Sequence, residues 1–545
     1  MSSQHHPHYF KPEWIENDPR ELWADVVIYG GTAAGVVAAK ALAERGRSVL
    51  ILNPAQVLGG MTTGGLGWTD FGKKGVIGGM SRRFYEDLGA HYGLEGPAWT
   101  FEPKAAQAVI DCYASNARIT VLHRQFLKRV ELDAGKIVAV EMLGGLLARG
   151  RYFMDCTYEG DLLGKAGVSY TVGREANRVY GETINGVQIR PKHQFSHPVD
   201  PYVIPGDPKS GTLPWVYEGE TAPEGSGDHK IQAYNFRVCM TDDPELKVDW
   251  VQPEGFRELD HELARRWFNT ETDDYNAHLP NGKNDDLPEP ESILRKFDVM
   301  EVRTKNGYLK TDTNNHGPVS TDFIGANYAW PEASYAQREV MFQEHYTYIM
   351  GHFWFMANDP SIPEVYRKGY ARFGLPKDEF PLTGHWPHQL YVREARRMVG
   401  DYVLNEKDTQ HHRQPEDPIA MGSYAMDSHN CQRFVRNGCV TNEGDVQLKP
   451  AAPYGVSYRS IVPARGQCPN LFVPVCLSAS HIAYGSVRME PVFMAIGESA
   501  AVAADLALET DSDVQDLDYS ALKARLESVG QVLTYQVAVG EATTD

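Results

Sequence analysis

The most constraining feature of this sequence is an apolar run that leads straight into a glycine turn. Residues 26–29 read Val-Val-Ile-Tyr, and Gly30-Gly31-Thr32 follows at once. Small apolar residues at helical spacing continue to residue 45, Gly46 ends that segment, and another β-type run occupies residues 48–52. This order predicts a βαβ unit of about 30 residues, in which a helix N-terminus receives the diphosphate of a dinucleotide.

Each position of the turn has a predicted task. Gly30 makes the tight turn, and Gly35 lets the helix pack closely on the strand. Thr32 stands where the middle glycine of the usual motif lets the backbone approach the phosphates, and its hydroxyl can donate to one of them. Asn53 stands where an acidic residue usually accepts hydrogen bonds from the adenosine ribose, and its amide oxygen can accept without charge. Alone, this motif leaves open an ordinary strand-turn-helix.

A second glycine cluster follows the next predicted strand. It reads Leu58-Gly59-Gly60-Met61-Thr62-Thr63-Gly64-Gly65. A backbone that passes beside a bulky isoalloxazine ring needs little side-chain volume and several amide donors. The cluster therefore indicates a flavin.

With both clusters, the chain resembles the glutathione-reductase-type FAD-binding superfamily, and within it a bacterial group of FAD-dependent oxidoreductases with a GGTxAG...LGGMTxGGLGWTD start. The resemblance extends over most of the chain and includes Asp155–Leu162, Asp312–Asn315, Ser320–Asn327, Gly384–Arg397 and Ser478–Pro491. It implies FAD as cofactor and an α/β fold, in which a discontinuous Rossmann-like FAD-binding domain carries an inserted α+β substrate domain. The expected boundaries are 1–20 for an N-terminal extension, 20–185 and 455–530 for the FAD-binding domain, and 186–454 for the substrate or cap domain.

The resemblance also implies which residues meet the cofactor. The strand ending at Asp155 would pass under it, which makes Thr157 and Gly160 its neighbours, and the backbone around Leu127 would meet the adenine. The family's acidic ribityl contact is replaced by the neighbourhood of Ser478, and a helix beginning near Pro491 would direct its positive end at the flavin. The predicted cofactor-binding residues are Gly30, Gly31, Thr32, Ala33, Ala34, Gly35, Asn53, Gly59, Gly60, Met61, Thr62, Gly64, Gly65, Leu127, Thr157, Gly160, Ser478 and Pro491.

Flavin-dependent dehydrogenation needs a base for one proton, besides the ring that takes a hydride. His481 is the first candidate because its loop should line the flavin, and a hydrogen-bonded structural histidine is the alternative. Arg488 lies seven residues on. It resembles the arginine with which fumarate-reductase-type relatives bind substrate carboxylates, although the spacing differs. Tyr484 can donate a proton or simply pack in the core.

A further set of candidates lies upstream of that loop. His385-x-x-His388 has a spacing that can hold a metal, but Pro387 breaks the helix such a pair would use. No metal is therefore expected, and His388 is a candidate for lining the substrate pocket. A helix is expected to begin near His388, with Arg393 and Arg397 on one face. Arg393 would touch the flavin or an anionic substrate, or form a salt bridge.

Composition limits the kinds of partner and the compartment that are expected for this chain. The formal net charge is −19, which argues against nucleic acid or an anionic membrane, because both need a basic face. Seven scattered cysteines without a C-x-x-C pair are typical of reduced thiols in a cytoplasmic protein. Neither a signal peptide nor a run of about 18 apolar residues is found, so no membrane span is expected. His5, His6 and His8 are expected in a frayed terminus. A homo-oligomer is left open.

The leading hypothesis is an FAD-dependent oxidoreductase, an oxidase or dehydrogenase, acting on a small polar organic molecule by hydride transfer to flavin N5. A sugar, polyol or other hydroxy compound is the expected substrate, because the middle segments are rich in Asn, His and Tyr. Two alternatives remain, namely a flavin-dependent isomerase or hydratase without net redox change and a redox-silent flavin-binding protein.

Overall fold

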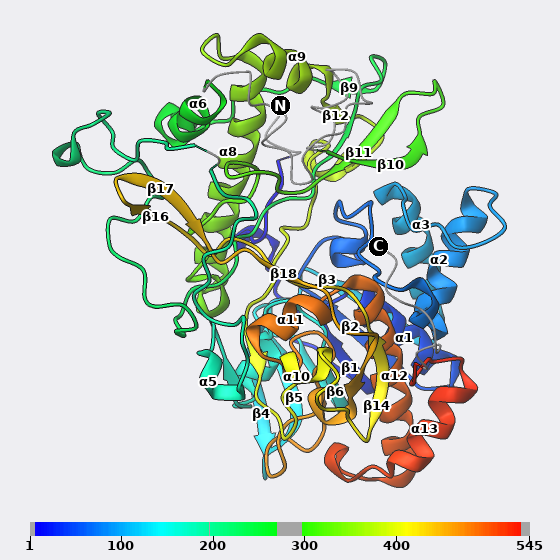
Figure 1. Cartoon of the computed structure of the whole chain (residues 1–545). Coiled ribbons are helices and arrows are strands. Elements are labelled where there is room, and N and C mark those ends of the chain that lie inside the picture. Colours follow the sequence, from blue (N-terminus) through cyan, green and yellow to red (C-terminus); the bar gives the residue numbers. More distant parts are fainter. Residues whose placement is uncertain (1–5, 196, 270–296, 536–545) are drawn as a thin grey trace.

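The computed structural model describes residues 6–195, 197–269 and 297–535, without the side chains of residues 297–301. Blue, cyan and orange-red segments from the two ends of the chain lie together in the lower half of Figure 1, where they build a sheet and its helices. The green middle of the chain forms the upper half, around the long helix α8 (Tyr335–Asn358). The first unit is therefore interrupted by the second.

One sheet organises the lower half. Its order is β3-β2-β1-β6-β5-β4, and β20 pairs with the end of β6. The first four strands and β20 are parallel, whereas β4 and β5 form an antiparallel extension. The strands are β1 (Glu21–Tyr29), β2 (Val49–Asn53), β3 (Ile119–His123), β4 (Leu127–Asp133), β5 (Lys136–Met142), β6 (Leu147–Asp155) and β20 (Leu471–Phe472). This arrangement confirms the predicted α/β class.

The parallel strands bring three functional segments to one edge of the sheet. The carboxyl ends of β1, β2 and β6 are level, because Tyr29 pairs with both Leu52 and Asp155. Gly30 follows the first of these strands, Asn53 ends the second, and Thr157 follows the third. In open parallel sheets, this edge is where ligands bind.

Two helices from opposite ends of the chain pack on this sheet. Helix α1 (Ala33–Glu44) lies against α12 (Glu490–Thr510), both rich in small residues. A Cβ on Gly497 of α12 would lie 2.5 Å from the carbonyl oxygen of Ala34, so the close approach needs glycine there. Among the described residues, α12 alone is long and apolar enough to cross a membrane by composition, and its whole apolar window is buried within the protein. The helix is therefore part of the core.

The other helices and strands are mostly short. The helices are α2 (Gly79–His91), α3 (Pro103–Ala114), α4 (Asp161–Lys165), α5 (Asn177–Tyr180), α6 (Glu262–Phe268), α9 (Glu364–Arg372), α10 (Glu406–Thr409), α11 (His481–Val487) and α13 (Tyr519–Ser528). The strands are β7 (Tyr170–Thr171), β8 (Cys239–Thr241), β9 (Lys247–Val248), β10 (Phe297–Arg303), β11 (Leu309–Thr313), β12 (Leu375–Pro376), β13 (Arg397–Met398), β14 (Pro418–Gly422), β15 (Met426–Ser428), β16 (Gln432–Arg436), β17 (Cys439–Glu443), β18 (Val446–Leu448) and β19 (Tyr454–Ser457). Residues 401–448 contain several of these short strands.

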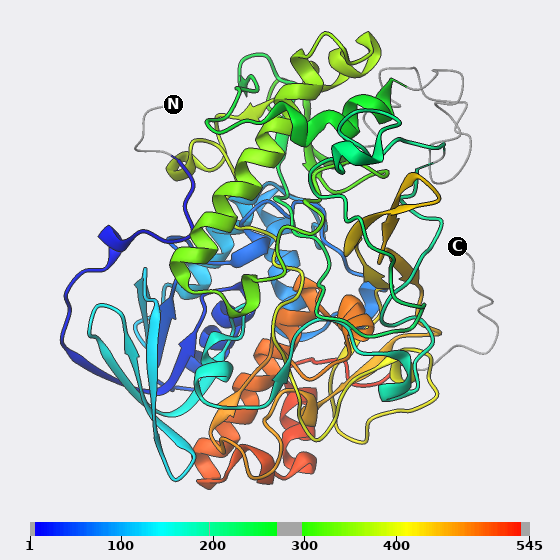
Figure 2. The same cartoon turned by 90° about the vertical axis from the view of Figure 1, so that its left-hand side faces the viewer.

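The N-terminal segment departs from the sequence-based expectation. His5 lies outside the described residues, but His6 and His8 are docked rather than frayed. His8 Nδ1 lies 2.7 Å from a carboxylate oxygen of Glu339 on α8, and His6 Nε2 lies 2.6 Å from Gln343 Oε1. Figure 2 shows the dark-blue segment running from α8 along the side of the molecule to the sheet.

Candidate functional site

A cavity opens at the carboxyl edge of the parallel strands. Its walls come from the glycine turn, from the loop after β2, from the segment after β6, from residues 382–390 and from the N-terminal segment. The lining residues include Gly30, Gly31, Thr32, Asn53, Gly60 and Thr157 from the predicted set, and His8, Tyr9, Trp14, Pro54, Ala55, Gln56, Val57, Tyr158, Glu159, Phe342 and Leu390 beyond it.

The glycine turn has the geometry that a diphosphate needs. Gly30 has a φ of +103°, and a Cβ there would lie 2.7 Å from the backbone of both Cys156 and Thr157. A Cβ on Gly35 would lie 2.2 Å from the Gly30 carbonyl oxygen. Thr32 caps α1 by accepting from the Gly35 amide. Because the first amides of a helix lack intrahelical acceptors, Ala33 and Ala34 present the positive end of α1 at the cavity. These residues fit a bound dinucleotide.

Asn53 has a different task from the one predicted. Its amide oxygen accepts from the Gly31 amide at 3.1 Å, and its amide nitrogen donates to the carbonyl oxygens of Ala55 and Val57. The side chain therefore fastens the glycine turn to the loop after β2. It lines the cavity, but its polar atoms are largely used within the protein.

The second glycine cluster runs from the cavity into the interior. Gly59 forms a bridge with Thr32, and Gly60 lines the cavity. A Cβ on Gly65 would lie 1.9 Å from the Arg237 carbonyl oxygen, so this part of the chain is held against the cap. Gly64 is equally tight, because a Cβ there would lie 2.4 Å from Gln389 Cβ. These glycines allow close approach to the cap, and their predicted contact with a flavin ring stays a prediction.

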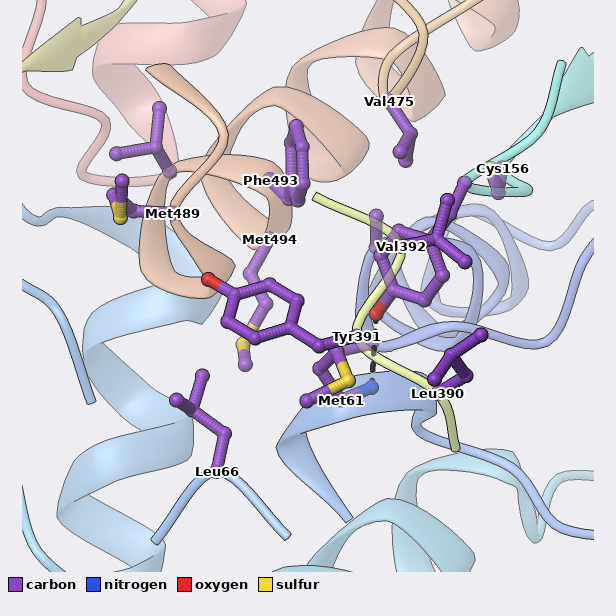
Figure 3. Close-up of a cluster of buried hydrophobic side chains, with 14 of the residues drawn as sticks. Met61, Leu66, Cys156, Leu390, Tyr391, Val392, Val475, Met489, Phe493 and Met494 are labelled. Atoms are coloured by element: carbon purple, nitrogen blue, oxygen red, sulfur yellow. Dashed lines mark hydrogen bonds between the residues drawn. The ribbon is translucent and has the colours of Figure 1, made fainter. Parts of the chain in front are cut away.

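An apolar cluster lies beside this segment and carries one buried acid. Figure 3 shows Met61, Leu390 and Tyr391 close to Phe493 and Met494 from the start of α12. Thr62 Oγ1 donates to Glu490 at 2.7 Å, and so does the Tyr158 hydroxyl. Burial raises the pKa of Glu490 to about 7, although both hydrogen bonds lower it. Pro491, the next residue, accepts a hydrogen bond from Ser81 through its carbonyl oxygen.

Leu127, Ser478 and Gly160 are among the predicted cofactor residues that do not line the cavity. The Leu127 amide donates to the Tyr29 hydroxyl, and the Leu127 carbonyl oxygen accepts from Tyr335, so neither group is available to an adenine. The Ser478 hydroxyl accepts from the Gly400 amide, which makes it a structural residue. Gly160, with a φ of +69°, begins α4, where a Cβ would approach Leu163 and Cys476. Their predicted roles are corrected accordingly.

His481 is held at both ring nitrogens. Nδ1 lies 2.8 Å from Glu394, and Nε2 lies 3.1 Å from the Ser428 hydroxyl. All three side chains are buried. Tyr484 packs in the core, where its hydroxyl donates to the Val475 carbonyl oxygen and burial raises its pKa well above the usual range. Both residues therefore have the structural geometry that the sequence left as an alternative.

The helix expected near His388 is absent from the described chain, because residues 390–396 are extended up to β13. Arg393 and Arg397 are buried and contact separate partners, namely Asp322 and Glu175. His388 lines the cavity and an adjoining one. Burial lowers its pKa to about 4, and its Nε2 has no hydrogen-bond partner among the described residues. His388 therefore presents a neutral imidazole.

The sequence did not reveal a buried group of charged side chains around Tyr391, which we call the polar cluster: Lys192, Asp322, Arg393, Asp427, His429 and Arg488. Tyr391 directly follows Leu390, which lines the cavity. The guanidinium groups of Arg393 and Arg488 lie 4.8 and 5.6 Å from the Tyr391 ring centroid. Arg488 also donates to the Tyr391 hydroxyl at 2.9 Å.

A histidine lies between two carboxylates in this cluster. His429 Nδ1 lies 2.7 Å from Asp322, and its Nε2 lies 3.4 Å from Asp427. Burial acts to raise the pKa of Asp427, but hydrogen bonding from His429 and the charges of Lys192 and Arg488 hold it well below the usual range. The Lys192 side chain is 32% exposed and that of Asp427 12%, so this part of the cluster is accessible.

The cluster also has unused hydrogen-bonding capacity. Within the described chain, Arg393 Nε, Arg488 Nε and Gln232 Nε2 are buried without a hydrogen-bond partner. Buried polar atoms are nearly always satisfied in folded proteins, so unsatisfied ones require an explanation. A polar ligand bound in the cluster would accept hydrogen bonds from these nitrogens and so account for them.

One group of acidic side chains in the described chain has the spacing of metal ligands: Glu102, Asp378 and Glu379. The Lys310 ammonium lies among them, 2.7 Å from Glu102, 3.0 Å from Asp378 and 2.8 Å from Glu379. The lysine itself thus supplies the positive charge, and the group forms a buried ion-pair network.

Comparison with known proteins gives one extensive match. The profile of the family described as FAD dependent oxidoreductase matches residues 25–526. No curated protein matches the chain significantly.

Similarity to solved structures is partial. L-proline dehydrogenase from P. horikoshii matches at 15% identity over 29% of this chain and 59% of its own, with a TM-score of 0.24. THI4 from Thermovibrio ammonificans matches at 21% identity over 28% of this chain and 66% of its own, with a TM-score of 0.23. Thioredoxin reductase from T. acidophilum matches at 19% identity over 24% of this chain and 34% of its own, with a TM-score of 0.17. The chain thus spans between 34% and 66% of the length of these proteins.

Proposed function

Because this chain belongs to the FAD dependent oxidoreductase family, we propose that it dehydrogenates a small polar hydroxy compound, such as a sugar or polyol, at the polar cluster. The family establishes an FAD-dependent oxidoreductase, and the substrate class rests on the cluster. Carboxylate acceptors beside guanidinium and ammonium donors can bind several hydroxyl groups at once. On its sequence motifs, we further place the chain in the glutathione-reductase-type superfamily.

The chain's own residues would bind the substrate and manage one proton. When bound, FAD supplies the hydride acceptor. Arg488 and Arg393 would donate hydrogen bonds to substrate oxygens through the nitrogens that now lack partners. Asp427, held in its anionic form, would accept from the hydroxyl to be oxidised. The substrate's carbon–hydrogen bond gives up a hydride, its hydroxyl gives up a proton, and a carbonyl forms.

The observation that carries this proposal is the placement of His429 between Asp322 and Asp427. A histidine oriented by one carboxylate can take a proton at its other nitrogen. We therefore assign the proton to His429, whose Nε2 faces the partly accessible Asp427 at 3.4 Å, rather than to His481, whose Nε2 faces the fully buried Ser428 hydroxyl. His481 acts as a positioning residue, since its partner Ser428 immediately precedes His429.

Anaerobic mixing of the holoenzyme with a panel of polyols, aldoses and 2-hydroxy acids tests the substrate class. The expected result is loss of the visible absorption band of the oxidised flavin with at least one hydroxy compound. Turnover without this loss would instead favour an isomerase or hydratase. Binding without turnover would favour a redox-silent flavin-binding protein, and either result would overturn the proposal.

Three variants test the proton acceptor. His429→Asn should retain bound flavin and lower the rate of flavin reduction about 100- to 10,000-fold, the usual contribution of a general base. His481→Asn should lower that rate less and leave its pH dependence unchanged. His229→Asn, at an exposed position, is the matched control. If His481→Asn lowers the rate of flavin reduction more than His429→Asn does, His481 is the proton acceptor and His429 the positioning residue.

A further inference from the structure

The N-terminal segment, residues 6–18, is anchored at its first end on α8. The Glu339 carboxylate accepts from the Tyr9 and Phe10 amides at 2.7 and 2.9 Å, and the Gln343 side chain donates to the Pro7 carbonyl oxygen. Phe10 packs edge-to-face on Phe126, with ring centroids 4.8 Å apart. These contacts bind backbone groups and a buried aromatic ring, so the attachment is specific.

The other end of the segment is anchored on the sheet. The Asp18 amide donates to the Gly144 carbonyl oxygen at 2.8 Å. Gly144 is also tight against the segment, because a Cβ there would lie 2.3 Å from the Glu16 carbonyl oxygen. Residues 6–18 therefore span from the cap to the turn between β5 and β6. We call them the N-terminal strap.

Between its two anchors, the strap forms part of the wall of the cofactor cavity. His8, Tyr9 and Trp14 line it together with the glycine turn and residues 53–57. The Arg124 guanidinium lies 4.9 Å from the Trp14 ring centroid and donates to Gln56 in the loop after β2. Trp14 is thus fixed at the end of the cavity where β2 terminates.

The two ends of the cavity can be assigned from the fold. In dinucleotide folds the diphosphate lies at the first glycine turn, and the ribose of the adenosine half lies at the end of the second strand. The end of the cavity near Asn53–Val57 therefore belongs to the adenosine half, and the end near Gly60, Tyr158 and Leu390 belongs to the flavin half.

We propose that the N-terminal strap is part of the FAD site and that Trp14 supplies an aromatic face for the adenosine half. This inference rests on FAD binding by the family and not on the substrate proposed above. An indole ring backed by a guanidinium is a preorganised stacking surface, because the cation fixes the ring before the ligand arrives. The proposal gives the residues before β1 a task that the glycine motifs do not include.

Equilibrium binding to apoprotein tests this role with three ligands, namely FAD, ADP and FMN. Base stacking on an aromatic side chain contributes about 1–3 kcal/mol, so Trp14→Ala should raise the Kd for FAD about 5- to 150-fold. The Kd for ADP should rise by a similar factor, and that for FMN should stay constant. Trp14→Phe should retain most of the affinity. Trp23→Ala, at a tryptophan that is 60% exposed on β1, is the matched control.

Hydrogen exchange of the unaltered protein provides a second readout. ADP should slow exchange at the amides of the strap, and FMN should not. Unchanged Kd values for FAD and ADP in Trp14→Ala would overturn the proposal. A loss of FMN affinity in Trp14→Ala equal to the loss of FAD affinity would also overturn it. The same holds if ADP does not slow hydrogen exchange at the amides of the strap. Failure to bind FAD at all would contradict the cofactor assignment, and absence of substrate-driven flavin reduction would bear only on the proposed function.

Discussion

Replacement of Glu490 by Gln should stabilise the protein in a pH-dependent way. Glu490 is buried, and burial raises its pKa from 4.5 to about 7. A carboxyl group with a raised pKa binds its proton more tightly in the folded chain than in the unfolded chain. Ionisation of Glu490 therefore leaves the free energy of unfolding unchanged below pH 4.5 and lowers it progressively as the pH rises toward 7. Above pH 7 the loss is constant.

The size of the effect follows from the shift. A difference of about 2.5 pKa units corresponds to about 3.4 kcal/mol in the free energy of unfolding, as an upper value. Glu490→Gln removes this cost and can still bond to Thr62 and Tyr158. The variant should gain about 3 kcal/mol relative to the wild type at pH 8 and less than about 1 kcal/mol at pH 5.

Urea unfolding of FAD-free protein, followed by tryptophan fluorescence, measures this difference at the two pH values. Because the comparison is between pH values, any change in hydrogen bonding that the amide introduces cancels to first order. Glu527→Gln, on the exposed surface of α13, is the control and should change nothing. A stability difference between Glu490→Gln and the wild type that is the same at pH 5 and pH 8 would refute the reasoning.

Further predictions concern the turn and two buried ion pairs. Gly30→Ala should abolish measurable FAD binding in titrations, because its Cβ would lie 2.7 Å from backbone atoms. Gly46→Ala, with a φ of +83° but open space around it, should cost about 1–2 kcal/mol of stability and leave the FAD Kd unchanged. Arg338→Met should lower the free energy of unfolding by up to about 3 kcal/mol, since it removes the bidentate partner of the buried Asp161 carboxylate and leaves Arg396 as its ion-pair partner. Lys310→Met should have an effect of similar size in the same denaturation assay, and a loss below 1 kcal/mol in either variant would contradict the inferred burial cost.

The sequence predicted the fold best where local pattern and tertiary structure agree. The run before Gly30 is apolar because β1 is covered on both faces, and the small residues after it allow α1 to contact α12. Both patterns lie within short windows of the sequence, so they can be recognised without knowledge of distant contacts. The α/β class, FAD and the oxidoreductase family are accordingly confirmed.

The errors arose where distant segments determine the local structure. The run from Leu390 to Arg396 was expected to be helical, but it is extended because each arginine forms an ion pair with a different segment: Arg393 with Asp322 and Arg396 with Asp161. Leu127 was assigned to the adenine by analogy, yet tyrosines from β1 and α8 occupy its backbone groups. No pattern within a short window contains these partners.

Two parts of the candidate site were beyond sequence reasoning for the same reason. The polar cluster joins Lys192, Asp322, Arg393, Asp427 and Arg488, which come from distant parts of the chain. The strap could have been suspected only from its composition, because its aromatic residues are unusual for a frayed terminus. In both cases burial, and not residue type, distinguishes the functional side chains from ordinary surface residues.

A crystal structure of the holoenzyme tests the central claim most directly. The account predicts the FAD diphosphate against Gly30–Thr32 and the adenosine half between residues 53–57 and Trp14. It also predicts the isoalloxazine beside Met61 and Tyr391, with its reactive edge toward His429. A ring bound elsewhere, with the polar cluster out of reach of its reactive edge, would contradict the account.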